Sequence, residues 1–281
     1  MPTLTSNPLA KHFRQPVMYF KLPSQGRWYT EGSLDLPASG EIPIYPMTAK
    51  DEITMKTPDA LMNGTSTISV IESCCPNIKN AWKMPAVDLD PILIAIRLAT
   101  YGNAMEFAAI CPHCSTQNER ALNLNTILDK VKPADWSKPI SISGLEIYIK
   151  PQTYEEFNKN NMVNFEEQRI MRMVQDENMS EEDKIANFGE LFKKLIATGL
   201  NQVSKSIDGI KLEDGTYVTD INHIREFLEN CDRSIWTSIK DRLTEIQNDI
   251  DYNQITMECE NEECNKSFVT PFIFEQSNFF D

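Results

Sequence analysis

Two pairs of cysteines, far apart in the chain, have the residue type and the spacing of metal ligands. Pro-His separates Cys111 from Cys114, and four residues separate Cys259 from Cys264. Each pair lies between two β-like runs and has the spacing of half a tetrahedral zinc site, and a structural site of this kind needs four ligands. We therefore predict that the two turns meet and that all four thiols bind one structural Zn²⁺. Such a site would stabilise the fold and would not itself catalyse a reaction.

Two other interpretations of these cysteines stay open. Cys-Pro-His-Cys is also an active-site pattern of thioredoxin-like thiol-disulfide oxidoreductases, but that motif should open a helix whose dipole lowers the pKa of the first thiol. The residues after Cys114 are instead typical of a polar turn followed by a strand. The remaining interpretation is that these are ordinary free cysteines in a reducing compartment. His113 is left out of the ligand set, because adjacent residues rarely both reach one ion.

The charge of the chain limits the kinds of partner it can bind. It has 281 residues, enough for one large or two modest cores, and its formal net charge is −14, from 41 acidic and 27 basic residues. An acidic protein lacks the Lys and Arg that neutralise phosphates, so a zinc-ribbon nucleic-acid-binding protein is a disfavoured alternative. The charge favours a basic protein partner or simply solubility.

The sequence also predicts a cellular compartment. No run approaches the ~20 apolar residues that a membrane span needs, and the first residues lack the charged and then apolar pattern of a signal peptide. The seven cysteines fit no disulfide framework. We therefore expect folding in reducing cytoplasm, without a membrane partner.

Hydrophobic periodicity predicts an α+β fold that is mostly helical, with short β-hairpins and a split zinc-ribbon-like module made of the two distant cysteine turns. The expected regions are an extended N-terminal arm with short strands (1–48), a helical region (49–102), the first cysteine hairpin with further strands (103–152), a second helical region with a small hairpin (153–250), and the second cysteine hairpin with an aromatic tail (251–281). Tyr19, Phe20, Trp28 and Tyr29 of the arm either pack on the core or bind a partner. The tail is expected to dock on the core or on another protein.

Several helix ends can be predicted from local chemistry. Thr48 is expected to cap a helix with acidic residues in its first turn, and residues 57–64 form a compact helix that Gly64 ends. Residues 67–73 predict another helix. The strongest helix, residues 90–101, has Asp90 as its cap, an apolar body that must be buried, and Gly102 at its end.

The second half has the same kinds of feature. Ser180 is expected to cap a long amphipathic helix, whose buried face comprises Ile185, Phe188, Leu191, Phe192, Leu195 and Ile196. Asp214-Gly215 predicts a hairpin turn, Asp220 a helix cap, and residues 232–248 a last helix.

Catalytic motifs are not found in the sequence. It has no phosphate-binding Gly-rich loop, no Gly-x-Ser-x-Gly and no His-Glu-x-x-His. The three histidines have no catalytic neighbours in sequence. We therefore do not expect an enzyme, and we expect no small-molecule substrate.

Three stretches in order resemble a family of T4-type tailed-phage baseplate proteins. They are Tyr45-Pro-Met-Thr-Ala-Lys-Asp-Glu with the residues up to Thr65, Asp90-Pro-Ile-Leu-Ile-Ala-Ile-Arg-Leu-Ala-Thr-Tyr-Gly, and Cys111-Pro-His-Cys. Residues 21–29 also resemble the opening motif of that family. The likeness covers residues 17–125 and continues more loosely through the second helical region.

The resemblance implies a non-enzymatic role in building a contractile tail, linked to the central baseplate hub and its assembly. The implied partners are other baseplate or hub proteins. The implied location is the host cytoplasm during assembly, and the virion tail if the protein stays in the finished particle. On this basis we expect residues 22–26, residues 50–52 and Arg97 to lie near the partner surface.

Overall fold

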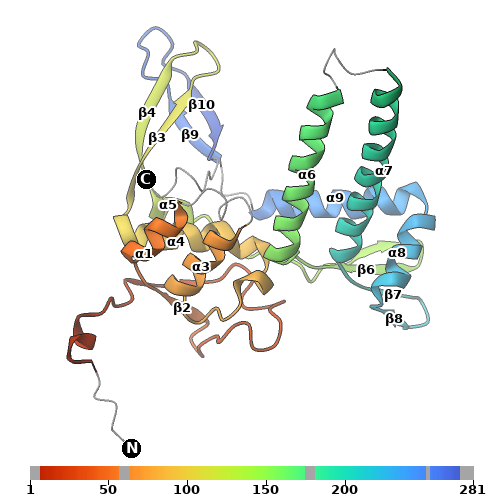
Figure 1. Ribbon diagram of the computed structural model, residues 1–281, viewed down its shortest axis with the longest axis horizontal. Helices are drawn as coiled ribbons and strands as arrows, with labels where there is room; N and C mark the ends of the chain where they lie inside the picture. Colours follow the sequence, from red (N-terminus) through yellow and green to blue (C-terminus); the bar gives the residue numbers. More distant parts are fainter. Residues whose placement is uncertain (1–6, 57–63, 175–180, 251–253, 273–281) are drawn as a thin grey trace, which may run out of the picture.

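The computed structural model describes residues 7–56, 64–174, 181–250 and 254–272, and these residues form an α+β structure of helices and small antiparallel sheets (Figure 1). The α-helices are α1 (Ala49–Met55), α3 (Thr65–Cys74), α4 (Leu89–Tyr101), α5 (Leu124–Leu128), α6 (Tyr154–Val174), α7 (Glu181–Lys205), α8 (Ile221–Asn230) and α9 (Arg233–Ile250), and the 3-10 helices are η1 (Pro8–His12), η2 (Ala81–Lys83) and η3 (Ala86–Asp88). The strands are β1 (Met18–Lys21), β2 (Glu41–Ile44), β3 (Ala104–Ile110), β4 (Gln117–Asn123), β5 (Ile140–Ile142), β6 (Leu145–Ile149), β7 (Ile207–Lys211), β8 (Tyr217–Val218), β9 (Gln254–Glu258) and β10 (Ser267–Pro271). No helix in the described part of the chain is long and apolar enough to cross a membrane.

The buried side chains form two hydrophobic cores. The first core joins β1, β2, α1, α3 and α4 with the two cysteine hairpins, β3–β4 and β9–β10. The second core lies between the four-stranded sheet β5-β6-β7-β8 and helices α8 and α9. Trp28 of the first part packs against the second core and contacts Trp136 edge-on, with ring centroids 5.6 Å apart. The division into five regions stays a prediction.

Helix α4 is the centre of the first core, as its apolar sequence predicts. All but four of its 13 side chains are buried, and Gly102 ends it with a φ of +91°, a conformation that favours glycine. The predicted cap, Asp90, is wrong by two positions. Asp88 occupies the N-cap position, and Asp90 lies in the first turn.

The side chain of Asp88 does not cap the helix, because it binds a distant loop instead. Its carboxylate accepts hydrogen bonds from the Ser24 backbone N–H (2.7 Å), the Ser24 hydroxyl (2.5 Å) and the Tyr29 hydroxyl (3.0 Å). The carboxylate is fully buried, and this burial raises its pKa from 3.8 to about 6. Burial also raises the pKa of Tyr29 well above its usual value.

Residues 14–56 are tied to the same core. Strands β1 and β2 pair antiparallel, with Phe20 opposite Ile42, and both of these side chains are buried. Tyr19 points the other way and is 63% exposed, whereas Tyr29 is half-buried against the core. Thr48 caps α1 as predicted, in a reciprocal capping box with Asp51. The predicted helix at 57–64 lies almost entirely outside the described residues.

The turns and one cap of the second half also follow their local chemistry. The β5–β6 turn has Ser143 and Gly144 at φ values of 52° and 76°, and the β7–β8 turn has Gly215 at 86°. Asp220 caps α8 by accepting hydrogen bonds from two backbone N–H groups, as predicted. The predicted cap Ser180 lies outside the described residues.

The predicted apolar face of α7 can be checked at one position only. Ile196, expected on the buried face, is 57% exposed. The side chains of the other five residues predicted for that face lie outside the described part of the structure.

Candidate metal centre

Each cysteine pair lies in the turn of a two-stranded hairpin. In the first turn the Cys111 N–H donates to the Thr116 carbonyl (2.9 Å), and in the second the Cys259 N–H donates to the Lys266 carbonyl (3.0 Å). The residue after the second cysteine has a positive φ in both turns, 61° at Ser115 and 40° at Asn265. Short polar residues tolerate this conformation better than bulky ones, so the local sequence fits the turn that presents the thiols.

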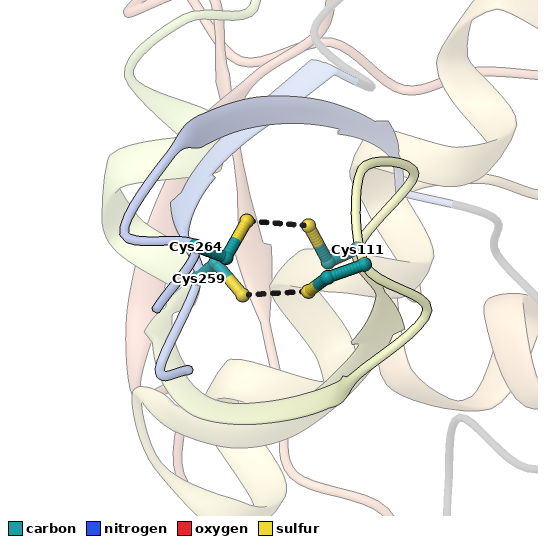
Figure 2. A group of neighbouring side chains, drawn as sticks. Cys111, Cys259 and Cys264 are labelled. Carbon is teal, nitrogen blue, oxygen red and sulfur yellow. Dashed lines mark hydrogen bonds between the residues drawn. The ribbon is translucent and has the colours of Figure 1, made fainter. Parts of the chain in front are cut away.

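The four predicted ligands meet between the two hairpins, and Figure 2 shows the sulfur of Cys111 facing that of Cys264. The Cys111–Cys264 sulfur distance is 4.0 Å, the Cys114–Cys259 distance is 3.4 Å, and all four sulfurs lie within 4.8 Å of one another. Tetrahedral coordination with Zn–S bonds of about 2.3 Å places sulfurs about 3.8 Å apart. A disulfide requires about 2.05 Å, so the arrangement fits a metal site and contains no disulfide.

The thiols of the cluster differ in acidity. The Thr116 hydroxyl, 3.3 Å from the Cys114 sulfur, lowers the pKa of that thiol to about 6. Burial raises the pKa of Cys259 to about 12 and also raises that of Cys264. In the absence of a cation, the cluster therefore favours the Cys114 thiolate beside the neutral thiols of Cys259 and Cys264. A divalent cation would stabilise several thiolates together, because thiolates are the form that binds metal.

The prediction from sequence missed the residues that join the two hairpins. Asn118 is fully buried, accepts a hydrogen bond from the Glu260 N–H (2.7 Å) and donates one to the Thr116 carbonyl (2.8 Å). The Asn261 side chain donates to the Thr116 hydroxyl (3.3 Å). The only trace of this role in the sequence is a polar residue at an inward position of a strand. Its partner is 142 residues away, and local patterns cannot show such a contact.

Neither structural requirement of the redox alternative is met at Cys111. The cysteine is buried, with none of its surface exposed, although a reactive thiol has to be accessible. The turn leads into β4, and the nearest helix downstream, α5, begins only at Leu124. The helix dipole that lowers the pKa of a thioredoxin-type nucleophile is therefore not present at this turn.

The residues expected near a partner surface are mostly internal, so that expectation is corrected. Leu22 and Ser24 are each 1% exposed, because Asp88 binds their loop into the core. Asp51 is buried in the capping box of α1. Arg97 is 8% exposed, and its guanidinium lies over the Tyr101 ring at 5.3 Å from the centroid. Lys50 and Gln25 remain exposed.

Asp51 has a basic partner that the sequence did not indicate. The Arg14 guanidinium lies 3.4 Å from the Asp51 carboxylate, donates to the Pro46 carbonyl (2.5 Å), and binds both the carbonyl (2.7 Å) and the hydroxyl (2.8 Å) of Ser73. Such charge-assisted hydrogen bonds are stronger than neutral ones. Arg14 therefore anchors the N-terminal residues on α1 and α3.

The start of the aromatic tail packs against the first cysteine hairpin. Phe272 is 2% exposed, and its ring centroid lies 6.0 Å from that of Phe107 on β3. The remaining tail residues, 273–281, lie outside the described part of the chain. The two hairpins therefore share an apolar contact at one end of their strands and the thiol cluster at the other.

These features define an α+β fold with a candidate metal centre between two hairpins. The chain belongs to the family described as T4 bacteriophage base plate protein, whose model matches residues 20–281. No curated protein and no solved structure matches it. Membership in the family supports a structural, non-enzymatic role in the phage baseplate, within the virion tail, and implies interaction with other phage tail proteins.

Proposed function

We propose that the protein is a component of a contractile phage tail that acts in assembly of the central baseplate hub, or as a subunit of it, through protein–protein contacts. The observation that carries this proposal is the family match across residues 20–281. The acidic charge disfavours nucleic-acid binding, and the burial of Cys111 disfavours its use as a redox nucleophile. The partners are other baseplate or hub proteins.

We also propose that Cys111, Cys114, Cys259 and Cys264 bind one structural Zn²⁺. The four sulfurs lie at distances close to those of a tetrahedral thiolate site. An isolated two-stranded hairpin is marginally stable at best, and β3–β4 and β9–β10 each form a sheet of only two strands. A metal bound by both hairpins would add its binding free energy to the stability of the folded chain.

The baseplate role is tested by deleting the gene from the phage and complementing it from a plasmid. Loss of infectious particles, with tails that lack a complete hub, is the expected result. Mass spectrometry of purified complemented particles then separates a subunit, which is present, from a transient assembly factor, which is absent. Normal tails from the deletion phage would refute the proposal.

The metal is tested by native mass spectrometry of the purified chain before and after acid release. We expect one zinc per wild-type chain and none in Cys114→Ser. Cys231→Ser is the matched control, because Cys231 lies outside the cluster and should leave the zinc in place. A metal-free but fully folded wild-type chain would refute the zinc proposal.

A further inference from the structure

The N-terminal residues have a charge opposite to that of the rest of the protein. Residues 1–30 contain Lys11, Arg14, Lys21 and Arg27 but no acidic residue, whereas the whole chain has a formal net charge of −14. Residues 31–281 are therefore four charges more negative than the chain as a whole. We name residues 7–19 the basic arm.

The basic arm is held at Arg14 and, from Val17 on, by its pairing with β2, and it is exposed from residue 7 to residue 13. Arg14 binds it to α1 and α3 through the hydrogen bonds described above. On either side of this anchor, apolar side chains face solvent: Leu9 is 63% exposed, Phe13 58% and Val17 57%. Figure 1 shows η1 projecting away from the body of the molecule. Exposed apolar residues beside cations, on a segment with a fixed root, are typical of an interaction site.

A second exposed surface on the same chain has the complementary chemistry. Strands β3 and β4 pair so that Glu106 lies opposite Ala121, Ala108 opposite Glu119 and Ile110 opposite Gln117. All six of these residues are exposed, and Ile110 is 68% exposed. We name this surface, which bears two carboxylates, two alanines and Ile110, the outer face of β3–β4. The opposite face of the same hairpin packs against the first core through Met105, Phe107 and Ala109.

The arm and this face cannot be joined within the chain as it is folded. Figure 1 shows the arm at one end of the first part of the molecule and the β3–β4 hairpin at the other, with α1, α3 and α4 between them. The Arg14 anchor fixes the root of the arm on the far side of those helices. Only a second molecule can therefore bring a basic arm to an outer face.

We infer that the basic arm of one copy of this chain docks on the outer face of β3–β4 of a second copy. Lys11 of the arm is matched with Glu106 and Glu119, and Leu9 and Phe13 are matched with Ile110 and the alanine surface. Two whole chains repel one another, because each has a net charge of −14. The orientation of the two copies is therefore determined by the local contact between the basic arm and the outer face of β3–β4. A reciprocal exchange of two arms would satisfy both contacts of each copy in one closed pair.

The test is sedimentation velocity of the full-length chain at physiological salt, over a concentration series up to about 100 μM, where a contact with a Kd of about 10 μM populates mainly the dimer. We expect Phe13→Ser and Lys11→Glu each to weaken self-association at least about tenfold, as loss of a central interface anchor does. Lys132→Glu is the matched control, since it changes the net charge equally at an exposed position outside both surfaces. Melting temperatures should be equal in all variants.

A mixing experiment identifies the acceptor surface. Neither Lys11→Glu alone nor Glu106→Lys alone should self-associate, because each has lost one side of the contact. A mixture of the two should form dimers, since the intact arm of one variant meets the intact face of the other and the two reversed charges attract.

Each outcome decides the inference. A monomeric wild-type chain, or association that the arm variants leave unchanged, refutes it and leaves the baseplate role standing. Arm variants that lose binding to a purified hub protein while the wild type stays monomeric would replace the second copy with that protein. Failure of the deletion phage to show a tail defect refutes the baseplate role alone, because the inference goes beyond that role and does not depend on it.

Discussion

Substitution of Asn118 by alanine tests whether the two cysteine hairpins depend on one buried amide. The change removes the acceptor for the Glu260 N–H at 2.7 Å and the donor to the Thr116 carbonyl at 2.8 Å. Each hydrogen bond of this kind contributes about 1 kcal/mol net, and more when its loss leaves a buried partner unsatisfied. Since Asn118 is fully buried, we expect a loss of about 2–3 kcal/mol.

This loss should appear mainly as weaker metal binding. A free-energy change of about 2–3 kcal/mol corresponds to a 30- to 150-fold change in an equilibrium constant, close to the roughly 10- to 100-fold that second-shell substitutions cost at other metal sites. The assay is competition for zinc with a chromophoric chelator at fixed pH, followed by thermal unfolding with and without zinc. Gln117→Ala is the control, since Gln117 is an exposed neighbour on the same strand.

Wild-type zinc affinity in Asn118→Ala would refute this reasoning. It would mean that the thiols alone position the two hairpins and that the amide contributes nothing to the site. An equal loss in Gln117→Ala would also contradict it, because the effect would then come from the strand and not from the buried amide.

Three further results are expected. The pKa of Asp88 is raised from 3.8 to about 6, so its protonated carboxyl stabilises the fold most below about pH 4, and this contribution is lost as the pH rises through about 6. In Asp88→Asn, the free energy of unfolding in urea should therefore change by about 3 kcal/mol less across this pH range than in the wild type. A pH dependence equal to that of the wild type would contradict the raised pKa. Arg14→Ala should lower the free energy of unfolding by about 2–3 kcal/mol, because Asp51 and the Ser73 carbonyl lose a charged donor. Calorimetry should show this as a decrease of about 4–6 °C in Tm, and a wild-type Tm would show that the anchor is dispensable. Zinc removal should speed hydrogen exchange in β9 and β10 and leave β6 and β7 unchanged, and uniform exchange would argue against a local metal site.

The parts of the structure that follow from local chemistry could be predicted from sequence. Thr48 and Asp220 cap their helices because each side chain reaches a backbone N–H two or three residues on. Gly102 and Gly215 take positive φ values where their turns require them. The cysteine spacings predicted which thiols would meet, because a turn of that length presents both sulfurs on one side.

The parts that depend on distant partners could not be predicted. In the sequence Asp88 is one of two acidic residues at the start of a helix, and its role comes from Ser24, 64 residues earlier. Arg14 had no sequence neighbour to indicate that it would bind Ser73. Arg97 interrupts an apolar run, and its burial over Tyr101 depends on how α4 packs. Side-chain chemistry specifies what such a residue can bind, and only the tertiary fold determines which partner it meets.

The separation of the two cysteine pairs also sets the order in which the folded protein can form. Cys259 follows Cys114 by 145 residues, which at about 5–20 residues per second is a delay of roughly 7–30 s during synthesis. For that time the first turn exists without its counterpart, and the first core lacks Ile255, Phe268 and Phe272. The first core, although built mostly from the N-terminal half, is therefore completed last. A chain whose synthesis stops before β9 lacks the C-terminal side chains of that core.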